Sequence, residues 1–365
     1  MKISFYAWGL GKGGAERVIS NLSNAFSRTD EVSIIINTKK GTEYDVNKNI
    51  RIFELDSKRT HGKIAQNIHR LSKTKELMDK INPDLILSFL PVPSFRILLI
   101  RRYIKGKIIV CERNDPEQEY KGIIKRTLMK LLYRKADGFI FQTNQQKEYF
   151  SKRIQKRSCV IENPIKEEFL HNSSDRKKEN TICNVGRLHP QKNQKLLIDS
   201  FKEIVDKYPD YRLKIYGDGP LKNDLIKYIE GQGLRKKVIL CGIVDNIKEE
   251  MLKSKVFVLS SDYEGMPNAL IEAMALGLPC ISTDCSCGGP RELITNDVDG
   301  ILVECNNRKM LASSIDELLS DKEKMARLSK NAKSIRRRLN PDAIYARWRR
   351  YIEIVINKKD KQGDD

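Results

Sequence analysis

The stretch "KVFVLSSDYEGMPNALIEAMALGLPCIST", Lys255 to Thr283, decides the fold class of this 365-residue chain. It begins with an apolar β-branched run and passes through a short loop. A helical segment follows and ends in Gly-Leu-Pro, just before a second apolar run. Glycine suits the residue just past a helix and proline blocks its continuation, so we expect a helix from about 267 to 275. A strand, a helix and a strand in this order predict a parallel sheet.

The same alternation runs through the whole chain. Strand-like runs in the first half are "KISFYAW", "VSIIIN", "DLILSFL", "KIIVCE" and "GFIFQT". Those in the second half are "TICNVG", "RLKIYG", "KVILCG", "KVFVLSS" and "LPCIST". A chain of this length exceeds one ordinary core, and the polar stretch 162–180 separates the two sets. We therefore predict an α/β protein with Rossmann-like domains at 1–163 and 164–340, and a helix at about 341–357 that packs back on the first.

The net charge of +20 is uneven along the chain. Residues 1–180 carry 36 Lys and Arg against 21 Asp and Glu, whereas residues 181–365 carry 32 against 27. This excess is either a solvated basic surface or an attraction for lipid headgroups, phosphorylated ligands or nucleic acid. The longest lipid-like run, "FRILLI", is too short to span a bilayer, and "MKISFYAW" resembles a strand more than a secretory signal. These features favour a cytoplasmic protein.

Two patterns in the sequence are similar to metal-binding motifs. The first is "CISTDCSC", which lacks a second ligand pair at zinc-like spacing, so we expect the eight cysteines to be buried or loop thiols. The second is "NDVDG", in which Asp297 and Asp299 imitate an Asp-x-Asp metal motif. We expect it to form the turn before the strand "GILV" instead.

A pair of cations follows the strand "TICNVG". Arg187 stands at the carboxyl end of this strand, and Lys192 lies five residues further on in "GRLHPQKN". A rigid guanidinium fork and a compact ammonium suit a diphosphate, although the two side chains can also belong to a mere loop rim. The glycines of "KIYGDGP" either frame the same cleft or form a simple turn.

The loop "GLGKGG" follows the first strand and leads into a helix. Its glycines, Gly9, Gly11, Gly13 and Gly14, allow the backbone to approach an anion at the helix start, or else form only a tight turn. Their spacing does not match the dinucleotide fingerprint G-x-G-x-x-G.

The loop inside the first quoted stretch carries two carboxylates, Glu264 and Glu272. Five helical residues cover roughly 7.5 Å, so the two acids are expected to bind separate groups rather than share a proton or a metal. Backbone groups between them face an anion, and a carboxylate aimed at the same anion is repelled. Each acid therefore contacts hydroxyls on one side of a phosphate pair. The intervening residues are Gly265, Met266, Pro267, Asn268 and Ala269.

These motifs together resemble glycosyltransferase family 4, whose members are retaining enzymes of the two-domain GT-B fold that use nucleotide sugars. The resemblance rests on "GRLHPQKN", "EGMPNALIEAMALGLPCISTD", "GGPRELI", "GGAER" and "ENPI", and it covers nearly the whole chain. It implies that Arg187 and Lys192 clamp the donor diphosphate and that these two cations, with Glu264, are the catalytic residues. It further implies that Glu272 binds the ribose and that Glu264, with the following amides, binds the donor sugar.

The resemblance implies two domains that face each other across a cleft, with the acceptor bound by residues 1–163 and the nucleotide sugar by residues 164–340. It also assigns roles to other residues. Gly13 and Gly14 resemble the loop that approaches the phosphates from the other domain, and Val244 stands where the family holds the nucleobase. Many members have a histidine where this chain has Arg113, so Arg113 is a possible donor-sugar contact. No metal or other cofactor is implied.

The resemblance implies a hexose or N-acetylhexosamine moved, from a UDP-sugar, to a polyprenyl-diphosphate-linked saccharide in O-antigen, capsule or glycan synthesis. The chain would then work as a peripheral protein on the inner face of the cytoplasmic membrane. "SFRILLIRRYIKGK" and "KGIIKRTLMKLLYRK" mix apolar and basic residues as membrane-surface helices do, or simply pack on a sheet.

Three rival readings stay open. A GT-B sugar-nucleotide epimerase shares the two-sheet architecture but is not expected to carry the two-glutamate loop. A basic nucleic-acid-binding protein fits the charge, but the sequence has no helix-turn-helix, zinc finger or aromatic-rich RNA-binding strand, so no nucleic-acid partner is expected. A catalytically dead scaffold is disfavoured because the expected donor ligands other than the histidine are present.

Overall fold

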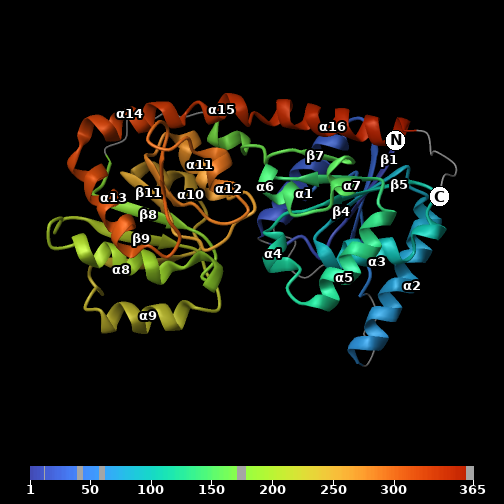
Figure 1. Cartoon of the computed structure of the whole chain (residues 1–365), viewed down its shortest axis with the longest axis horizontal. Coiled ribbons are helices and arrows are strands. Elements are labelled where there is room, and N and C mark those ends of the chain that lie inside the picture. The colour runs from blue at the N-terminus through green and yellow to red at the C-terminus, as the bar shows by residue number, and fades with distance from the viewer. Residues whose placement is uncertain (12, 39–43, 57–61, 171–177, 359–365) are drawn as a thin grey trace. The chain divides into compact units, whose positions relative to one another are not determined.

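The computed structural model describes residues 1–11, 13–38, 44–56, 62–170 and 178–358. The chain forms two compact units, which are Met1–Asn163 together with the segment from Asp342 onward, and Pro164–Pro341 (Figure 1). Part of the predicted boundary stretch, residues 171–177, lies outside the described residues.

The first unit is built on a parallel sheet of seven strands in the order β3-β2-β1-β4-β5-β6-β7. The strands are β1 (Lys2–Tyr6), β2 (Glu31–Ile36), β3 (Arg51–Glu54), β4 (Leu85–Phe89), β5 (Lys107–Cys111), β6 (Gly138–Phe141) and β7 (Ser158–Val160). The helices are α1 (Gly14–Phe26), α2 (Lys63–Ile81), α3 (Pro91–Leu99), α4 (Pro116–Glu119), α5 (Ile123–Leu132), α6 (Asn144–Glu148), α7 (Lys152–Gln155) and α16 (Pro341–Asn357).

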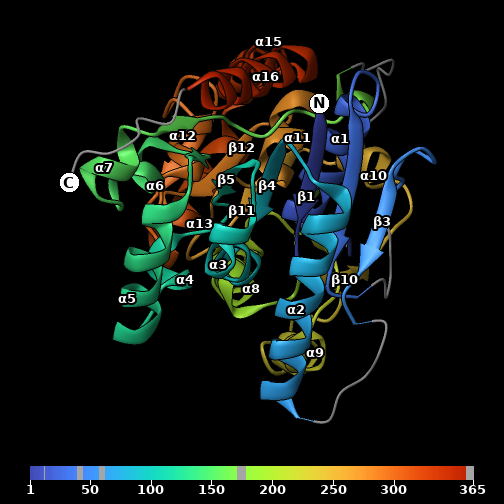
Figure 2. The same ribbon diagram turned by 90° about the vertical axis from the view of Figure 1, so that its right-hand side faces the viewer.

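Helices cover both faces of this sheet, as buried parallel strands require. One face packs against α2, α3 and α5, which lie together in Figure 2, through a core that includes Leu77, Leu98 and Leu132. On the other face, the Phe5 ring lies 6.3 Å from Phe26 of α1, and the Phe89 ring lies 6.4 Å from Trp348 of α16. The C-terminal helix is therefore part of the first unit's core.

The second unit has a parallel sheet of six strands in the order β10-β9-β8-β11-β12-β13. The strands are β8 (Thr181–Val185), β9 (Arg212–Tyr216), β10 (Val238–Gly242), β11 (Val256–Leu259), β12 (Cys280–Thr283) and β13 (Ile301–Val303). The helices are α8 (Gln194–Ile204), α9 (Lys222–Gly231), α10 (Ile247–Lys253), α11 (Asn268–Leu276), α12 (Gly289–Leu293), α13 (Arg308–Ser320), α14 (Lys322–Ala332) and α15 (Ile335–Arg338). Both predicted parallel-sheet units are thus confirmed.

The strand predictions held wherever the run was long and apolar, but two strands were missed. These are β3, whose sequence is "RIFE", and β7, whose sequence is "SCV". Both lie at the edges of the first sheet and none of their residues is fully buried, so neither has the continuous apolar run that marks a central strand.

Candidate donor-binding site

The loop between β11 and α11 places the two predicted glutamates in different settings. Glu264 lies in the loop and Glu272 lies five residues into the helix, and they are only 6% and 4% exposed. The helix begins at Asn268, one residue later than predicted, because Pro267 keeps an extended ψ of 105° and serves as the N-cap. Gly277 ends it in the left-handed conformation with φ 74°, as the Gly-Leu-Pro ending indicates.

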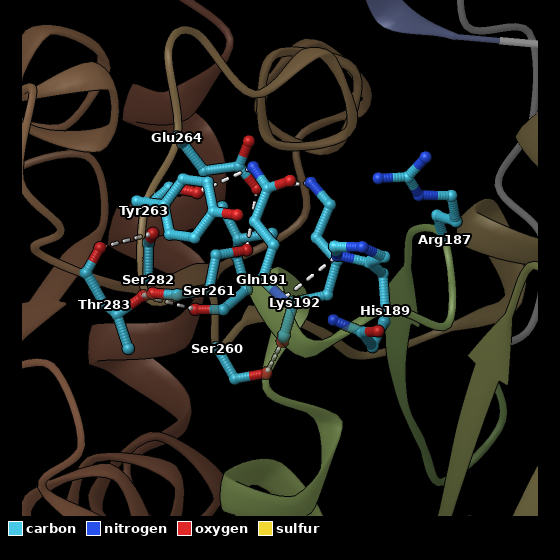
Figure 3. A network of polar contacts seen from close by, with 12 residues as sticks. Arg187, His189, Gln191, Lys192, Ser260, Ser261, Tyr263, Glu264, Ser282 and Thr283 are labelled. Atoms are coloured by element: carbon cyan, nitrogen blue, oxygen red, sulfur yellow. Dashed lines mark hydrogen bonds and ion pairs between the residues drawn. The ribbon is translucent and has the colours of Figure 1, made fainter. Parts of the chain in front are cut away.

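Lys192 and Glu264 form an ion pair across the middle of the second sheet (Figure 3). Lys192 ends a short 3₁₀ turn after β8, Glu264 follows β11, and these two strands are neighbours in the sheet. The strand order reverses between them, and such a switch point at the carboxyl ends is where open α/β sheets bind ligands. The same Glu264 oxygen accepts a hydrogen bond of 2.7 Å from the hydroxyl of Ser261. Lys192 and Glu264 are thus held as one charged unit.

Hydrogen bonds join the loops that carry this ion pair. The Gln191 side-chain amide donates to the carbonyl of Tyr263 at 2.8 Å, and the Asp262 amide donates to the carbonyl of Gln191 at 2.9 Å. The hydroxyl of Ser260 donates to the carbonyl of Lys192 at 2.9 Å. These contacts preorganise the charged groups. Sequence reasoning missed Gln191 and Ser260, although each lies beside a predicted site residue or at the end of a predicted strand.

Arg187 differs from Lys192 because its guanidinium is exposed and no described carboxylate pairs with it (Figure 3). Its carbonyl accepts a 3.0 Å hydrogen bond from Gln194, which fixes the backbone at the end of β8. Burial lowers the pKa of the nearby His189, and the charges of Arg187 and Lys192 lower it further. At the end of β8, the guanidinium of Arg187 therefore presents a positive charge that no described carboxylate neutralises.

Glycines allow the neighbouring loops to approach the site closely. A Cβ at Gly217 would lie 2.0 Å from the carbonyl oxygen of Gly186, which precedes Arg187. A Cβ at Gly289 would lie 1.9 Å from the carbonyl oxygen of Gly265, which follows Glu264. The glycines of "KIYGDGP" and "GGPREL" are thus needed for the packing of the loops that carry the charged residues.

The remaining predicted residues of the second unit lie at the same edge of the sheet. Val244 is half-buried just after β10, Met266 is 6% exposed, and Asn268 and Ala269 are half-buried in the first turn of α11. The nucleobase role of Val244 stays a prediction.

The Asp-x-Asp pattern is a turn before β13, as expected. Asp297 forms ion pairs with Lys324 at 2.6 Å and Arg327 at 3.5 Å, and Asp299 accepts a 2.8 Å hydrogen bond from the amide of Thr295. All eight cysteines are free thiols. In the described ranges, no three His, Cys, Asp or Glu side chains gather closely enough to hold a metal ion.

The predicted site residues of the first unit lie in two places. Gly13 is the N-cap of α1 and Gly14 its first residue, and a Cβ on Gly13 would meet the carboxylate of Glu16. Arg113, just after β5, is only 8% exposed, and its guanidinium donates to Asn163 at 3.2 Å. The proposed sugar contact of Arg113 stays a prediction, while its present neighbours are protein groups.

Comparison with known proteins agrees with this geometry. Residues 166–335 match the family described as glycosyl transferases group 1, and residues 12–169 match glycosyltransferase family 4. A relative described as an uncharacterized glycosyltransferase of Methanocaldococcus jannaschii is 32% identical over 71% of this chain and 73% of its own length. The chain therefore belongs to the glycosyltransferases that these two family models describe, and it is a glycosyltransferase.

Two further relatives have more specific names. One is the GalNAc-alpha-(1->4)-GalNAc-alpha-(1->3)-diNAcBac-PP-undecaprenol alpha-1,4-N-acetyl-D-galactosaminyltransferase of Campylobacter jejuni, 29% identical over 98% of this chain and 99% of the relative. The other is the UDP-Gal:alpha-D-GlcNAc-diphosphoundecaprenol alpha-1,3-galactosyltransferase of Escherichia coli. It is 36% identical over 48% of this chain and 46% of the relative.

Solved structures confirm the GT-B fold. Anabaena HepE in complex with UDP and glucose superposes with a TM-score of 0.82 at 18% identity, covering 97% of this chain and 100% of HepE. Sucrose-phosphate synthase from Thermosynechococcus elongatus gives a TM-score of 0.85 at 17% identity, covering 98% and 100% of the two chains.

Proposed function

We propose that this enzyme transfers a hexose or N-acetylhexosamine from a UDP-sugar to a polyprenyl-diphosphate-linked saccharide, with retention of configuration, during glycan assembly. The observation that carries the proposal is the exposed Arg187 beside the Lys192 and Glu264 ion pair at the switch point of the second sheet. Two relatives whose names include undecaprenol-linked acceptors support the acceptor class. One of them is named for a UDP-sugar, which supports the donor class.

In this proposal Arg187 binds the donor diphosphate through its planar fork, and Lys192 shares its ammonium between the diphosphate and Glu264. Negative charge grows on the diphosphate as its bond to the sugar breaks, and both cations are already in place to stabilise it. Acceptor attack and diphosphate departure take place on the same face of the sugar. The proposal requires no metal ion, because two fixed cations can neutralise the leaving group.

The two glutamates have different tasks. Glu264 is held by Lys192 and Ser261, and it contacts hydroxyls of the donor sugar. Glu272 lies deeper in α11 and binds the ribose hydroxyls. The acids contact sugars rather than phosphates because a carboxylate beside a phosphate is repelled.

An assay of sugar transfer tests the proposed function. The protein is incubated with UDP- and GDP-sugars and a synthetic lipid-linked acceptor, and the products are weighed and their anomeric configuration determined. Arg187→Ala should lower turnover about a hundred- to thousandfold, the usual effect of removing a preorganised donor at a developing charge. Arg235→Ala is the matched control, because its side chain is 82% exposed on the loop before β10, at the amino end of that strand. Turnover of Arg187→Ala within about threefold of the parent protein would contradict the assignment.

We propose further that α5 docks the enzyme on the anionic inner face of the cytoplasmic membrane. Ile123 and Ile124 are 82% and 80% exposed, Leu131 is 55% exposed, and Lys125 and Lys130 lie on the same short helix. Apolar side chains flanked by cations suit the interface of an anionic bilayer. Among the described residues, no helix has an apolar stretch sufficient to traverse a bilayer.

Vesicle flotation tests this docking. Binding to anionic vesicles should exceed binding to zwitterionic ones and should weaken with salt. The double change Ile123→Glu and Ile124→Glu should abolish it, whereas Ile226→Glu, at a 39% exposed position on α9, should not. Equal binding by all three proteins would count against α5.

A further inference from the structure

Trp8 is a large aromatic residue that lies partly exposed at the carboxyl edge of the first sheet. It lies two residues after the end of β1 and is 45% exposed, whereas Trp348, the only other tryptophan of the chain, is fully buried. Its carbonyl accepts a 3.0 Å hydrogen bond from the amide of Asn37, just after β2, so its backbone is fixed. A fixed, exposed indole offers a flat face to a ligand.

Side chains of α2 hold the indole in place. The Arg70 guanidinium lies 5.5 Å from the centroid of the Trp8 ring. Arg70 is in turn bound to both carboxylate oxygens of Asp56, at 2.7 and 2.5 Å, and Gln66 donates to the same carboxylate at 2.6 Å. The charge of Arg70 is thus balanced by Asp56, and its role here is to support the ring.

An open cavity of about 530 Å³ lies beside this ring. It is lined by Trp8, Gly62, Lys63, Gln66, Asn67 and Arg70. Its volume falls within the range of small-molecule sites. In the first sheet β2 and β3 lie on one side of β1 and β4 lies on its other side, so the strand order reverses at β1. Because Trp8 follows β1, the cavity borders this switch point.

The lining matches one class of ligand. The negative face of an indole attracts the weakly positive C–H groups on one face of a pyranose ring. The side-chain amide of Asn67 can both donate to and accept from hydroxyls or an N-acetyl group, whereas that of Gln66 is bound to Asp56. Lys63, exposed on the first turn of α2, supplies a point charge suited to a phosphate. A purely lipid ligand has no use for these polar groups.

We propose that this cavity binds the saccharide of the diphosphate-linked acceptor, with Trp8 as the stacking platform and Lys63 on the diphosphate. This inference rests on the proposed function, because it assigns the acceptor saccharide of that reaction to one particular cavity of the first unit. Asn67 then contacts the hydroxyl or N-acetyl groups of the sugar, which makes it a specificity residue.

Tryptophan fluorescence tests binding without any need for turnover. The signal of Trp8 is the difference between the parent protein and Trp8→Phe, since Trp348 stays buried in both. The probe is a water-soluble, short-chain prenyl-diphosphate N-acetylhexosamine. We expect it to change the Trp8 emission to saturation and to protect Trp8 from acrylamide quenching. No change in the parent protein, or an equal change in Trp8→Phe, would overturn the proposal.

Two further titrations identify the group that is recognised. Inorganic diphosphate alone should give a much weaker response than the prenyl-linked sugar, and Lys63→Ala should weaken the binding of both. If diphosphate alone gives the full response, the cavity is a phosphate site and the saccharide assignment is wrong. Because these are binding measurements, they remain decisive even if the enzyme turns out to use a different donor.

Kinetics provide the second readout. Trp8→Ala should raise KM for the lipid-linked acceptor by at least about tenfold while UDP affinity stays unchanged, and Asn67→Ala should raise it by about three- to tenfold. Ile64→Ala is the matched control, because Ile64 is 79% exposed on the same turn of α2 and does not line the cavity. An unchanged acceptor KM in Trp8→Ala would refute the proposal, whereas failure of all transfer in the parent protein would refute the proposed function instead.

Discussion

The guanidinium of Arg113 lies 5.1 Å from the ring centroid of Trp348 and 5.2 Å from that of Phe89, beside two rings that stack on each other with their centroids 6.4 Å apart. Arg113 therefore joins β4, β5 and the C-terminal helix, and it also bonds to Asn163, the last residue of the first unit before the chain enters the second. The point at which the chain leaves the first unit is thus bonded to this buried side chain, and the helix with which the chain returns to that unit packs against it.

Removing the Trp348 ring should destabilise the first unit selectively. Trp348→Ala is expected to cost about 3–5 kcal/mol, because a fully buried aromatic ring and its contact with Arg113 are both lost. Urea unfolding followed by hydrogen exchange mass spectrometry reports each unit separately. Ile354→Ala, at a 57% exposed position on the same helix, should change stability by less than about 0.5 kcal/mol. An equal loss in both units would show that the helix does not belong to the first unit's core.

The buried Glu112 should make the stability of the first unit depend on pH. Complete burial raises its pKa from 4.5 to about 7, although Tyr120 and Tyr133 donate to it at 2.6 and 2.5 Å and Arg113 lies beside it. The folded state therefore holds this proton when the unfolded chain has lost it. The stabilisation is complete below pH 4.5 and is lost as the pH rises to about 7, by about 3 kcal/mol at most.

Both tryptophans lie in the first unit, so tryptophan emission during urea unfolding measures this effect. Glu112→Gln should flatten the stability profile between pH 4.5 and 7, whereas Glu117→Gln, an exposed change nearby, should leave it intact. If the stability of Glu112→Gln still falls between pH 4.5 and 7, the pH dependence comes from other groups and the prediction for Glu112 is wrong.

The ion pair of Lys192 and Glu264 predicts coupled effects on donor binding. Lys192→Ala removes a diphosphate ligand and leaves a buried carboxylate without its cation, so the single changes should not be additive. A double-mutant cycle with Glu264→Gln, measured by calorimetry with UDP, should give a coupling energy of about 0.5–3 kcal/mol. Strict additivity would mean that the pair does not act as a unit when the donor binds.

Substitutions of Glu272 and Glu264 should affect donor binding and turnover differently. Glu272→Gln is expected to weaken UDP binding more than it slows the bound complex, because it contacts the ribose in the proposed function. Glu264→Gln is expected to do the reverse, because it contacts the transferred sugar. UDP affinity and kcat, measured for both variants, check this reversal, and the same pattern in both would contradict the assigned roles.

The contact between Gly289 and Gly265 predicts a steric effect. Gly289→Ala places a methyl group 1.9 Å from the Gly265 carbonyl oxygen, so the loop that carries Glu264 must shift and UDP affinity should fall about tenfold or more. Gly231→Ala is the matched control, because a Cβ there meets nothing within 4 Å at the end of α9. That change should leave UDP affinity unaltered. Equal affinity in the two variants would show that the loop tolerates the shift.

Sequence reasoning predicted the framework of this protein because its central strands are long apolar runs separated by turn residues. It placed Glu264 in a loop and Glu272 in a helix, because glycine and proline punctuate that segment clearly. It could not predict that Lys192 pairs with Glu264, since the two residues are 72 positions apart and only the sheet order makes them neighbours. It also treated Arg113 by analogy with a histidine that contacts the donor sugar, whereas tertiary packing buries it against the rings of Phe89 and Trp348.

The return of the C-terminal helix to the first unit has a consequence for biosynthesis. Domains usually fold in the order in which they leave the ribosome. Here the second unit is complete in sequence at Pro341, whereas the first still lacks Ile344, Trp348 and Ile352, which are fully buried in its core. The unit that is translated first is therefore completed last, and the Phe89 ring, which stacks on Phe5 on one side, lacks its contact with Trp348 until the C-terminal helix has been made.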